Sequence, residues 1–140
     1  MPTATSKWGG IGDWDVSVVQ DFTSAFSKNR NKIGDYEADG NPKAVTFVGT
    51  DMSKWITTSA TSLDSTFHSA GEMNADLSGW TVGKVTTMQN AFTATTSLTS
   101  CNKRRITDAW KDSRAFVATS YDTDWEGDTC TVRFKYRAAR

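Results

Sequence analysis

The residues best suited to chemistry form an acidic run over residues 122–128, Asp-Thr-Asp-Trp-Glu-Gly-Asp. Carboxylates at alternate positions with a following glycine are typical of the first half of a calcium-binding loop. The twelfth position counted from the first aspartate is Arg133, where such a loop needs a bidentate glutamate. The run therefore predicts at most a weak calcium site, at Asp122, Asp124 and Asp128. The alternative interpretation is an acidic capping loop held by Trp125.

Catalytic patterns are scarce in the rest of the chain. His68 is the only histidine, and it follows Phe67 near an expected helix end, where an exposed or capping histidine is common. No phosphate loop, Cys-x-x-Cys pair or nucleophile elbow occurs in the sequence. Cys101 has no histidine nearby to activate it as a nucleophile. We therefore predict a protein that is not an enzyme and has no cofactor.

Two cysteines, Cys101 and Cys130, flank the last part of the chain. A bridge between them would tie a helix near the first to a strand after the second, and loop-closure entropy puts its contribution at about 3–4 kcal/mol. We expect a disulfide and, with it, an oxidising extracytoplasmic location: secreted, cell surface or organelle lumen. Two unpaired buried thiols are the alternative.

Aromatic residues at fixed spacing organise the elements that precede this segment. Trp55 and Trp80 are 25 residues apart, and a phenylalanine follows each repeat tryptophan 12 residues later. An aliphatic residue also stands three positions before each of these tryptophans. One unit of this kind cannot bury its apolar face alone, so neighbouring units must stack. The predicted repeat core consists of Trp14, Phe26, Trp55, Phe67, Trp80 and Phe92.

Within a unit, the pattern predicts a strand followed by a short helix. Trp80 and Val82 share one face of a strand, and Val85, Met88 and Phe92 then fall at i, i+3 and i+7 on one stripe of a helix. The predicted fold class is α/β, a short leucine-rich-repeat-like solenoid of about three strand–helix units with a C-terminal cap.

A single repeat domain is predicted over residues 1–140. Its parts are repeat units at 10–27, 48–72 and 73–98, an insertion loop at 28–47 and a C-terminal cap at 99–137. Insertions in repeat proteins often lie on the binding face. A tolerated surface loop is the alternative, because long insertions cost little stability.

The cap is expected to contain one helix and one strand. Asn102 is the expected N-cap of the helix, on which Ile106 and Trp110 share a face. In the strand, Val132, Phe134 and Tyr136 would alternate with basic residues. Because terminal repeats must cover the last open core face, this different sequence suits a cap.

The unit at residues 76–92, Asp-Leu-Ser-Gly-Trp-Thr-Val-Gly-Lys-Val-Thr-Thr-Met-Gln-Asn-Ala-Phe, resembles the BspA-like leucine-rich repeat of mycoplasma lipoproteins. Trp-Asp-Val-Ser at 14–17 matches the centre of that pattern. The segment 97–130, with both cysteines, resembles the cap of marine algal members. The resemblance implies a repeat fold, surface or secreted placement, and adhesion or protein binding without catalysis. The chain departs from the family in its small number of repeats.

Charge is balanced overall but unevenly distributed. The 16 basic and 16 acidic residues argue against a general nucleic-acid binder. Every acidic residue precedes position 129, and four basic residues follow it, so the tail carries +4 and the rest −4. No apolar run is long enough to span a membrane. The tail can therefore lie against its own acidic body or against an acidic partner.

These features together predict a binding protein. The candidate partner contacts are two aromatic residues outside the repeat register and three residues of the basic tail: Trp8, Tyr36, Arg133, Lys135 and Arg137. The predicted function is a non-catalytic protein–protein interaction or scaffold protein, with an accessory subunit of a larger assembly as one form. A secreted or cell-surface protein that binds polysaccharide or ice is the alternative, because the chain is rich in threonine.

Overall fold

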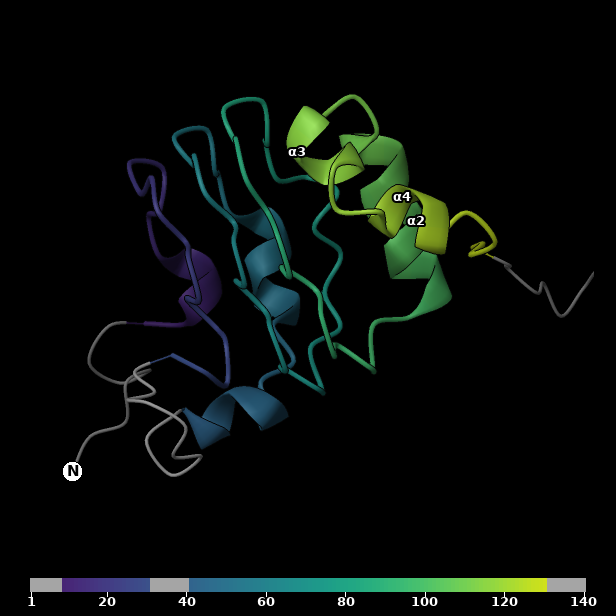
Figure 1. The fold of residues 1–140 in the computed structure, drawn as a ribbon. Helices are drawn as coiled ribbons and strands as arrows, with labels where there is room; N and C mark the ends of the chain where they lie inside the picture. The colour runs from purple at the N-terminus through teal and green to yellow at the C-terminus, as the bar shows by residue number, and fades with distance from the viewer. Residues whose placement is uncertain (1–8, 31–40, 131–140) are drawn as a thin grey trace, which may run out of the picture.

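Three coiled units lie side by side, and a group of short helices covers the last of them (Figure 1). The structure, a computed structural model, describes residues 9–30 and 41–130. The helices of the cap are α2 (Ser100–Trp110), α3 (Arg114–Val117) and α4 (Tyr121–Asp124). Among the described residues, the 3-10 helices before the cap are η1 (Ile11–Asp13), η3 (Pro42–Thr46) and η4 (Thr50–Lys54).

The predicted α/β fold class is wrong. Residues 9–30 and 41–130 contain no sheet, and their extended backbone pairs only at two isolated parallel bridges. These bridges join Asp21 to Ser62 and Ser62 to Thr87. Within the same residues, every α-helix follows Thr99, so no repeat unit has a helix after its tryptophan. The strand–helix unit of a leucine-rich-repeat solenoid is therefore absent from the described chain.

Each unit consists instead of consecutive tight turns. In the third unit, main-chain hydrogen bonds close turns at 77–80, 82–85 and 88–91, with N···O distances of 2.9, 3.1 and 3.2 Å. The first and fourth residues of each turn are buried, and the two between them are exposed or half-buried. A tight turn brings its first and fourth residues close together. Turns therefore produce the same i, i+3 apolar spacing that a helical stripe does.

Main-chain hydrogen bonds join the units in a constant register. Alternate N–H groups of one unit donate to carbonyl oxygens of the next, over 2.8–3.1 Å. The pairs are Phe22 to Ser62, Ser24 to Asp64, Phe26 to Thr66 and Lys28 to His68, then Leu63 to Thr87, Ser65 to Gln89, Phe67 to Ala91 and Ser69 to Thr93. Because these N–H groups point at the neighbouring unit, they cannot make the i→i−4 bonds of an α-helix.

A left-handed residue recurs at one position of every unit. Ser24, Ser65 and Asn90 have φ of 56°, 52° and 58°. A right-handed helix cannot pass through this conformation, which costs a residue with a Cβ about 1–2 kcal/mol. These residues are separated by 41 and 25 positions, as the three repeat tryptophans are. The units thus share a backbone path that excludes the expected helix.

Aromatic rings form the centre of the core. Trp55 stacks on Trp80 with centroids 5.9 Å apart, and Phe67 stacks between Phe26 and Phe92 at 5.6 and 5.8 Å. All except Phe26, which is partly buried, are buried. Stacked aromatic pairs add about 0.5–1.5 kcal/mol beyond their buried area.

The tryptophan side chains also bond to the preceding unit through their indole N–H groups. Trp55 donates to the carbonyl oxygen of Ile11 and Trp80 to that of Met52, both over 2.8 Å. Each acceptor lies three residues before the tryptophan of its own unit. The aliphatic residue that the sequence places there therefore supplies a main-chain acceptor as well as apolar surface.

Trp14 does not belong to this core, contrary to the prediction. Its side chain is 41% exposed. The other two repeat tryptophans lie over a preceding unit, whereas no described unit precedes Trp14. Its own 3-10 turn, η1, packs against η4 of the second unit, where a Cβ on Gly12 would lie 2.7 Å from the main-chain oxygen of Asp51. Glycine at this position allows the close approach.

The insertion after the first unit returns the chain close to its starting point. The N–H of Asn41 donates to the carbonyl oxygen of Lys28 over 2.7 Å. The ring of Phe47 then stacks on that of Phe26, with centroids 4.8 Å apart. Residues 31–40 lie outside the described part. The described ends of the insertion are therefore tied to the first unit.

The cap closes the aromatic core at the third unit. Helix α2 begins at Ser100, and its N-cap is Thr99, whose side chain accepts the Asn102 N–H. The expected cap, Asn102, is instead inside the helix. Ile106 and Trp110 are both buried, on the face that the sequence predicts. The expected strand at residues 132–136 lies outside the described residues.

Candidate functional site

An apolar hollow lies on the first unit, around the exposed tryptophan. Asp13, Trp14, Asp15, Val16 and Val19 line this shallow hollow, which is open to solvent. The segment leaves η1 in an extended conformation at Trp14. A turn then forms, closed by the Val19 N–H on the Val16 carbonyl oxygen over 3.0 Å. The turn holds the two valines beside the indole and so creates an apolar surface.

Val18 extends this apolar surface at the tip of the turn. It is 79% exposed, more than the other exposed large apolar residues of the described chain. The equivalent residues of the second and third units are Ser59 and Lys84. The sequence analysis missed Val18, although aligning the three units would have shown an apolar residue where the others are polar. We name Trp14, Val18 and the lining residues the first-unit hollow.

Acidic groups stand at the rim of the first-unit hollow. Hydrogen bonds from the Ser17 hydroxyl and then from its N–H hold the pKa of Asp15 below its ordinary value, so this carboxylate is ionised at neutral pH. Asp13 pairs with Lys54 over 3.6 Å, and both side chains are exposed. An exposed pair contributes little to stability. The rim therefore favours a partner that brings an apolar side chain and a basic group.

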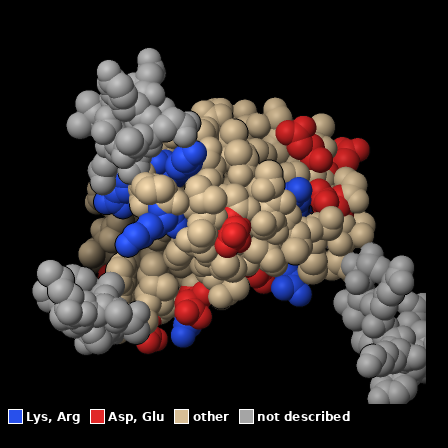
Figure 2. Space-filling model, turned by 90° about the horizontal axis from the view of Figure 1, so that it is seen from below, with Lys and Arg blue, Asp and Glu red and all other residues tan. Residues whose placement is uncertain are grey.

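On one face of the molecule, charged side chains gather in local clusters. Seen from below, several Lys and Arg side chains lie toward the left, the side of the first unit, and several Asp and Glu lie at the right end (Figure 2). Residues 121–128 of the cap carry four acidic side chains and no basic one. Such an arrangement influences how a charged partner orients on the surface more than how tightly it binds.

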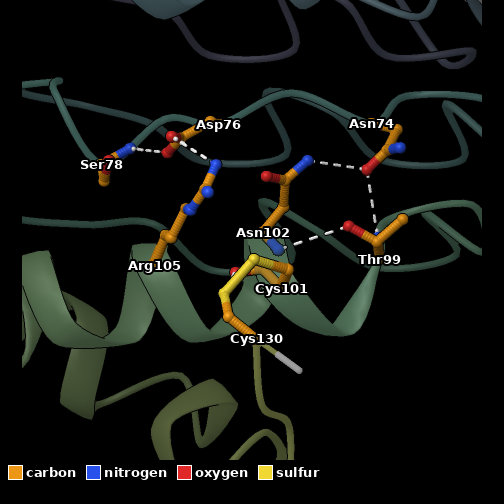
Figure 3. Close-up of a disulfide and its surroundings, with 8 residues drawn as sticks. All are labelled: Asn74, Asp76, Ser78, Thr99, Cys101, Asn102, Arg105 and Cys130. Atoms are coloured by element: carbon orange, nitrogen blue, oxygen red, sulfur yellow. Dashed lines mark hydrogen bonds and ion pairs between the residues drawn. A yellow bond between two sulfur atoms is a disulfide. The ribbon is translucent and has the colours of Figure 1, made fainter. Parts of the chain in front are cut away.

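The predicted disulfide between Cys101 and Cys130 is present. Close to it, the side-chain oxygen of Asn74 accepts the N–H of Thr99 over 3.1 Å and the amide of Asn102 over 2.8 Å (Figure 3). The bridge lies at the start of α2, where the helix meets the third unit. It holds the chain after α4 to the same place.

An ion pair makes a second attachment of the cap. Arg105 lies 3.3 Å from Asp76, which also accepts the Ser78 N–H over 3.0 Å (Figure 3). Burial raises the pKa of Asp76, but the hydrogen bonds from Ser78 and the charge of Arg105 outweigh it. The pKa therefore lies below its ordinary value, and the carboxylate stays ionised at neutral pH.

The carboxylates of the acidic run do not converge on one point in the described structure. Asp122 and Asp124 lie in α4, and Asp128 follows it. Across residues 9–30 and 41–130, no three metal-binding side chains come together closely enough to hold an ion. Trp125 is buried and stacks on Tyr121, with centroids 5.0 Å apart. These contacts favour the alternative interpretation, an acidic capping loop held by Trp125.

His68 makes contacts between units. Its Nδ1 lies 3.0 Å from the side-chain nitrogen of Asn29 and 3.1 Å from the hydroxyl of Ser69. The contact with Asn29 ties the second unit to the start of the insertion, whereas Ser69 is the next residue of the same unit. The candidate partner contacts lie outside the described residues: Trp8, Tyr36, Arg133, Lys135 and Arg137.

The geometry defines a class of small protein in which turn-built repeat units stack and a disulfide-bonded helical cap closes one end. The chain belongs to the family described as "Mycoplasma protein of unknown function, DUF285", which it matches over residues 3–124. The match extends over all three units and through α4. Comparison with curated proteins and with solved structures finds no match. Within the described residues, no helix is long and apolar enough to cross a membrane.

Proposed function

We propose that this protein is a non-catalytic protein-binding module that acts as a scaffold or as an accessory subunit of a larger assembly. The first-unit hollow is the observation that carries the proposal. Tryptophan is enriched among the few residues that contribute most of the binding energy at protein interfaces. The exposed fraction of Trp14 corresponds to roughly 100 Å², and its burial is worth about 2.5 kcal/mol.

The open edge of the first unit adds main-chain acceptors to this surface. Carbonyl oxygens of the second and third units accept N–H groups from the unit before them. The equivalent carbonyls of Asp21 and Thr23 accept no hydrogen bond from the residues that the structure describes. A partner segment with unpaired N–H groups therefore has acceptors available next to the apolar anchor.

The location and the narrower family assignment belong to the same proposal. The disulfide supports an oxidising compartment outside the cytoplasm, since structural disulfides rarely persist in the cytosol. The family match and the cysteine-containing cap support assignment to the BspA-like surface proteins with an algal-type cap.

A polysaccharide- or ice-binding role has less support. Thr61 and Thr86 occupy the same position in successive units and are both exposed. Their hydroxyls lie 3.1 and 3.3 Å from the carbonyl oxygens of Gln20 and Thr61, to which they donate. These hydroxyls join units to one another, so the threonines serve the fold.

The test compares tagged wild-type protein with Trp14→Ser and Val117→Ser in extracts of the source organism. Val117 is 48% exposed on α3, so its substitution is a matched loss of exposed apolar surface. We expect native mass and a constant set of co-purifying proteins to survive Val117→Ser and to be lost with Trp14→Ser. An unchanged set with Trp14→Ser, in variants of equal thermal stability, would refute the proposal.

A further inference from the structure

A second hollow lies at the opposite end of the row, between the third unit and the cap. It is a cleft of about 660 Å³, bounded by residues 80–86 on one side and 109–115 on the other. Gly83 lines this cleft together with Arg114 and Ala115 of α3. Trp80, Val82, Val85 and Trp110 form its apolar part and are buried. A cleft of this size and composition is typical of ligand and peptide sites.

The first unit contacts the second, and the second contacts the third, through equivalent surfaces. The third unit presents the same surface to this cleft. The N–H and hydroxyl of Thr61 donate to the carbonyl oxygen of Gln20, over 2.7 and 3.1 Å. Thr86 makes the same two bonds to the carbonyl of Thr61, over 2.9 and 3.3 Å. The next acceptor in this series is the carbonyl oxygen of Thr86. No residue of the described chain donates to it.

The cap continues the core but not this contact. Trp110, Tyr121 and Trp125 pack against Phe92 with centroids 5.9, 5.5 and 5.3 Å away, so they take the place of the next phenylalanine. At residues 80–86 the cap residues stand apart from the unit and leave the cleft. A further coil would occupy this space in a longer repeat protein.

We propose that the cleft binds an extended peptide segment of a partner protein, which adds one more coil to the third unit. The segment donates a main-chain N–H to the Thr86 carbonyl and places an apolar side chain against Val82 and Ala109, which line the cleft. The cleft continues the interface that already joins the units, and this continuity identifies the occupant as polypeptide. The site is separate from the first-unit hollow and does not depend on it.

Asp112 and Arg114 lie at the rim of the cleft, with Ser113 between them. Because Asp112 and Arg114 carry opposite charges, the rim does not favour a strongly acidic or a strongly basic segment. The segment that this chain itself lays on its second unit, Ser78–Met88, carries one lysine and otherwise uncharged residues. A peptide of that sequence is therefore a suitable probe.

The experiment titrates fluorescein-labelled peptide 78–88, with blocked ends, into the oxidised protein and follows anisotropy. Gly83 lines the cleft, and Gly83→Trp places a large side chain there without strain, because a Cβ on Gly83 meets nothing within 4 Å and its φ is not left-handed. Gly127→Trp is the matched control, since a Cβ there also meets nothing and the residue lies outside the cleft. We expect micromolar binding by the wild type and the control, and at least about tenfold weaker binding by Gly83→Trp.

Two outcomes would overturn the proposal. One is absence of peptide binding to the wild type up to about 1 mM, and the other is equal binding of a scrambled peptide. Amide chemical shifts of the wild-type protein give a second readout that needs no variant. Shifts at residues 81–86 and 109–115 support the cleft, whereas shifts confined to the first unit contradict it.

Discussion

Two buried tryptophans of the core differ in their hydrogen bonding, and the difference predicts opposite effects of the same substitution. The indole N–H of Trp80 donates to the Met52 carbonyl oxygen, whereas that of Trp110 has no partner among the described residues. The two side chains are 3% and 1% exposed. Replacement by phenylalanine removes one N–H and a similar side-chain volume at either position. The difference between the two changes in stability therefore reports the contribution of the Trp80 hydrogen bond.

The magnitudes follow from these contacts. Each change removes about 40 Å³ of side chain and costs about 1 kcal/mol through the cavity. Trp80→Phe also loses a hydrogen bond worth about 1 kcal/mol. The Met52 carbonyl oxygen still accepts the main-chain N–H of Trp55, so it is not left unpaired. We expect Trp80→Phe to lower the free energy of unfolding by about 2 kcal/mol. Trp110→Phe also removes a buried unpaired N–H, whose desolvation costs about 1–3 kcal/mol, so stability should stay the same or rise by up to about 2 kcal/mol.

Urea titration followed by circular dichroism measures both changes with the disulfide intact. Midpoints should shift while the slope with denaturant stays constant, since neither variant alters the surface exposed on unfolding. Equal destabilisation by the two substitutions would refute the reasoning. It would mean that the Trp110 N–H has an acceptor in solution, or that the Trp80 bond contributes nothing.

Three further predictions concern single backbone or charge features. Gly12→Ala should destabilise the fold by about 1–3 kcal/mol, because its Cβ would lie 2.7 Å from the Asp51 oxygen. Gly83→Ala should change the free energy of unfolding in urea by less than about 0.5 kcal/mol, because a Cβ on Gly83 meets nothing within 4 Å. Equal destabilisation by Gly12→Ala and Gly83→Ala would contradict the packing of η1 on η4. Ala94→Gly should stabilise by about 0.5–1 kcal/mol, because Ala94 has φ of 62°. The same change at Ala109, inside α2, should destabilise by about as much, and a loss at both sites would count against strain at Ala94. Asp76, whose pKa is lowered in the fold, should contribute stability that is complete above about pH 4 and lost as the pH falls below it. Asp76→Asn should therefore weaken the acid dependence of the urea midpoint between pH 6 and pH 3, and an unchanged dependence would exclude the ion pair as its source.

The register of the units could be predicted from the sequence, but their secondary structure could not. Tryptophans at 14, 55 and 80 give the offsets of 41 and 25 that the hydrogen bonds between units follow. Apolar residues at i and i+3 suit both a helix and a series of turns, and local spacing cannot distinguish them. Hydrogen bonding between units decides in favour of turns, and that bonding is a property of the stack.

Some features of the candidate site could likewise be predicted from the sequence, and others could not. The disulfide followed from the positions of Cys101 and Cys130 around the cap. The exposure of Trp14 depends on which unit lacks a predecessor, and a repeat pattern treats all units as equivalent. Thr99 and Asn102 are both good N-cap residues, so the sequence alone does not decide where α2 begins. In the structure α2 begins at Ser100, and Asn74 accepts hydrogen bonds from both Thr99 and Asn102.

The disulfide has a mechanical consequence. When the two ends of the chain are pulled apart, tension passes directly from Cys101 to Cys130 and does not enter the residues between them. Helices α3 and α4, and all of α2 except its first residue, lie inside this covalent ring. Roughly 100 Å of contour length, at about 3.4 Å for each residue, therefore stays hidden from force until the bridge is reduced. The repeat units can be stretched while the cap bears no load.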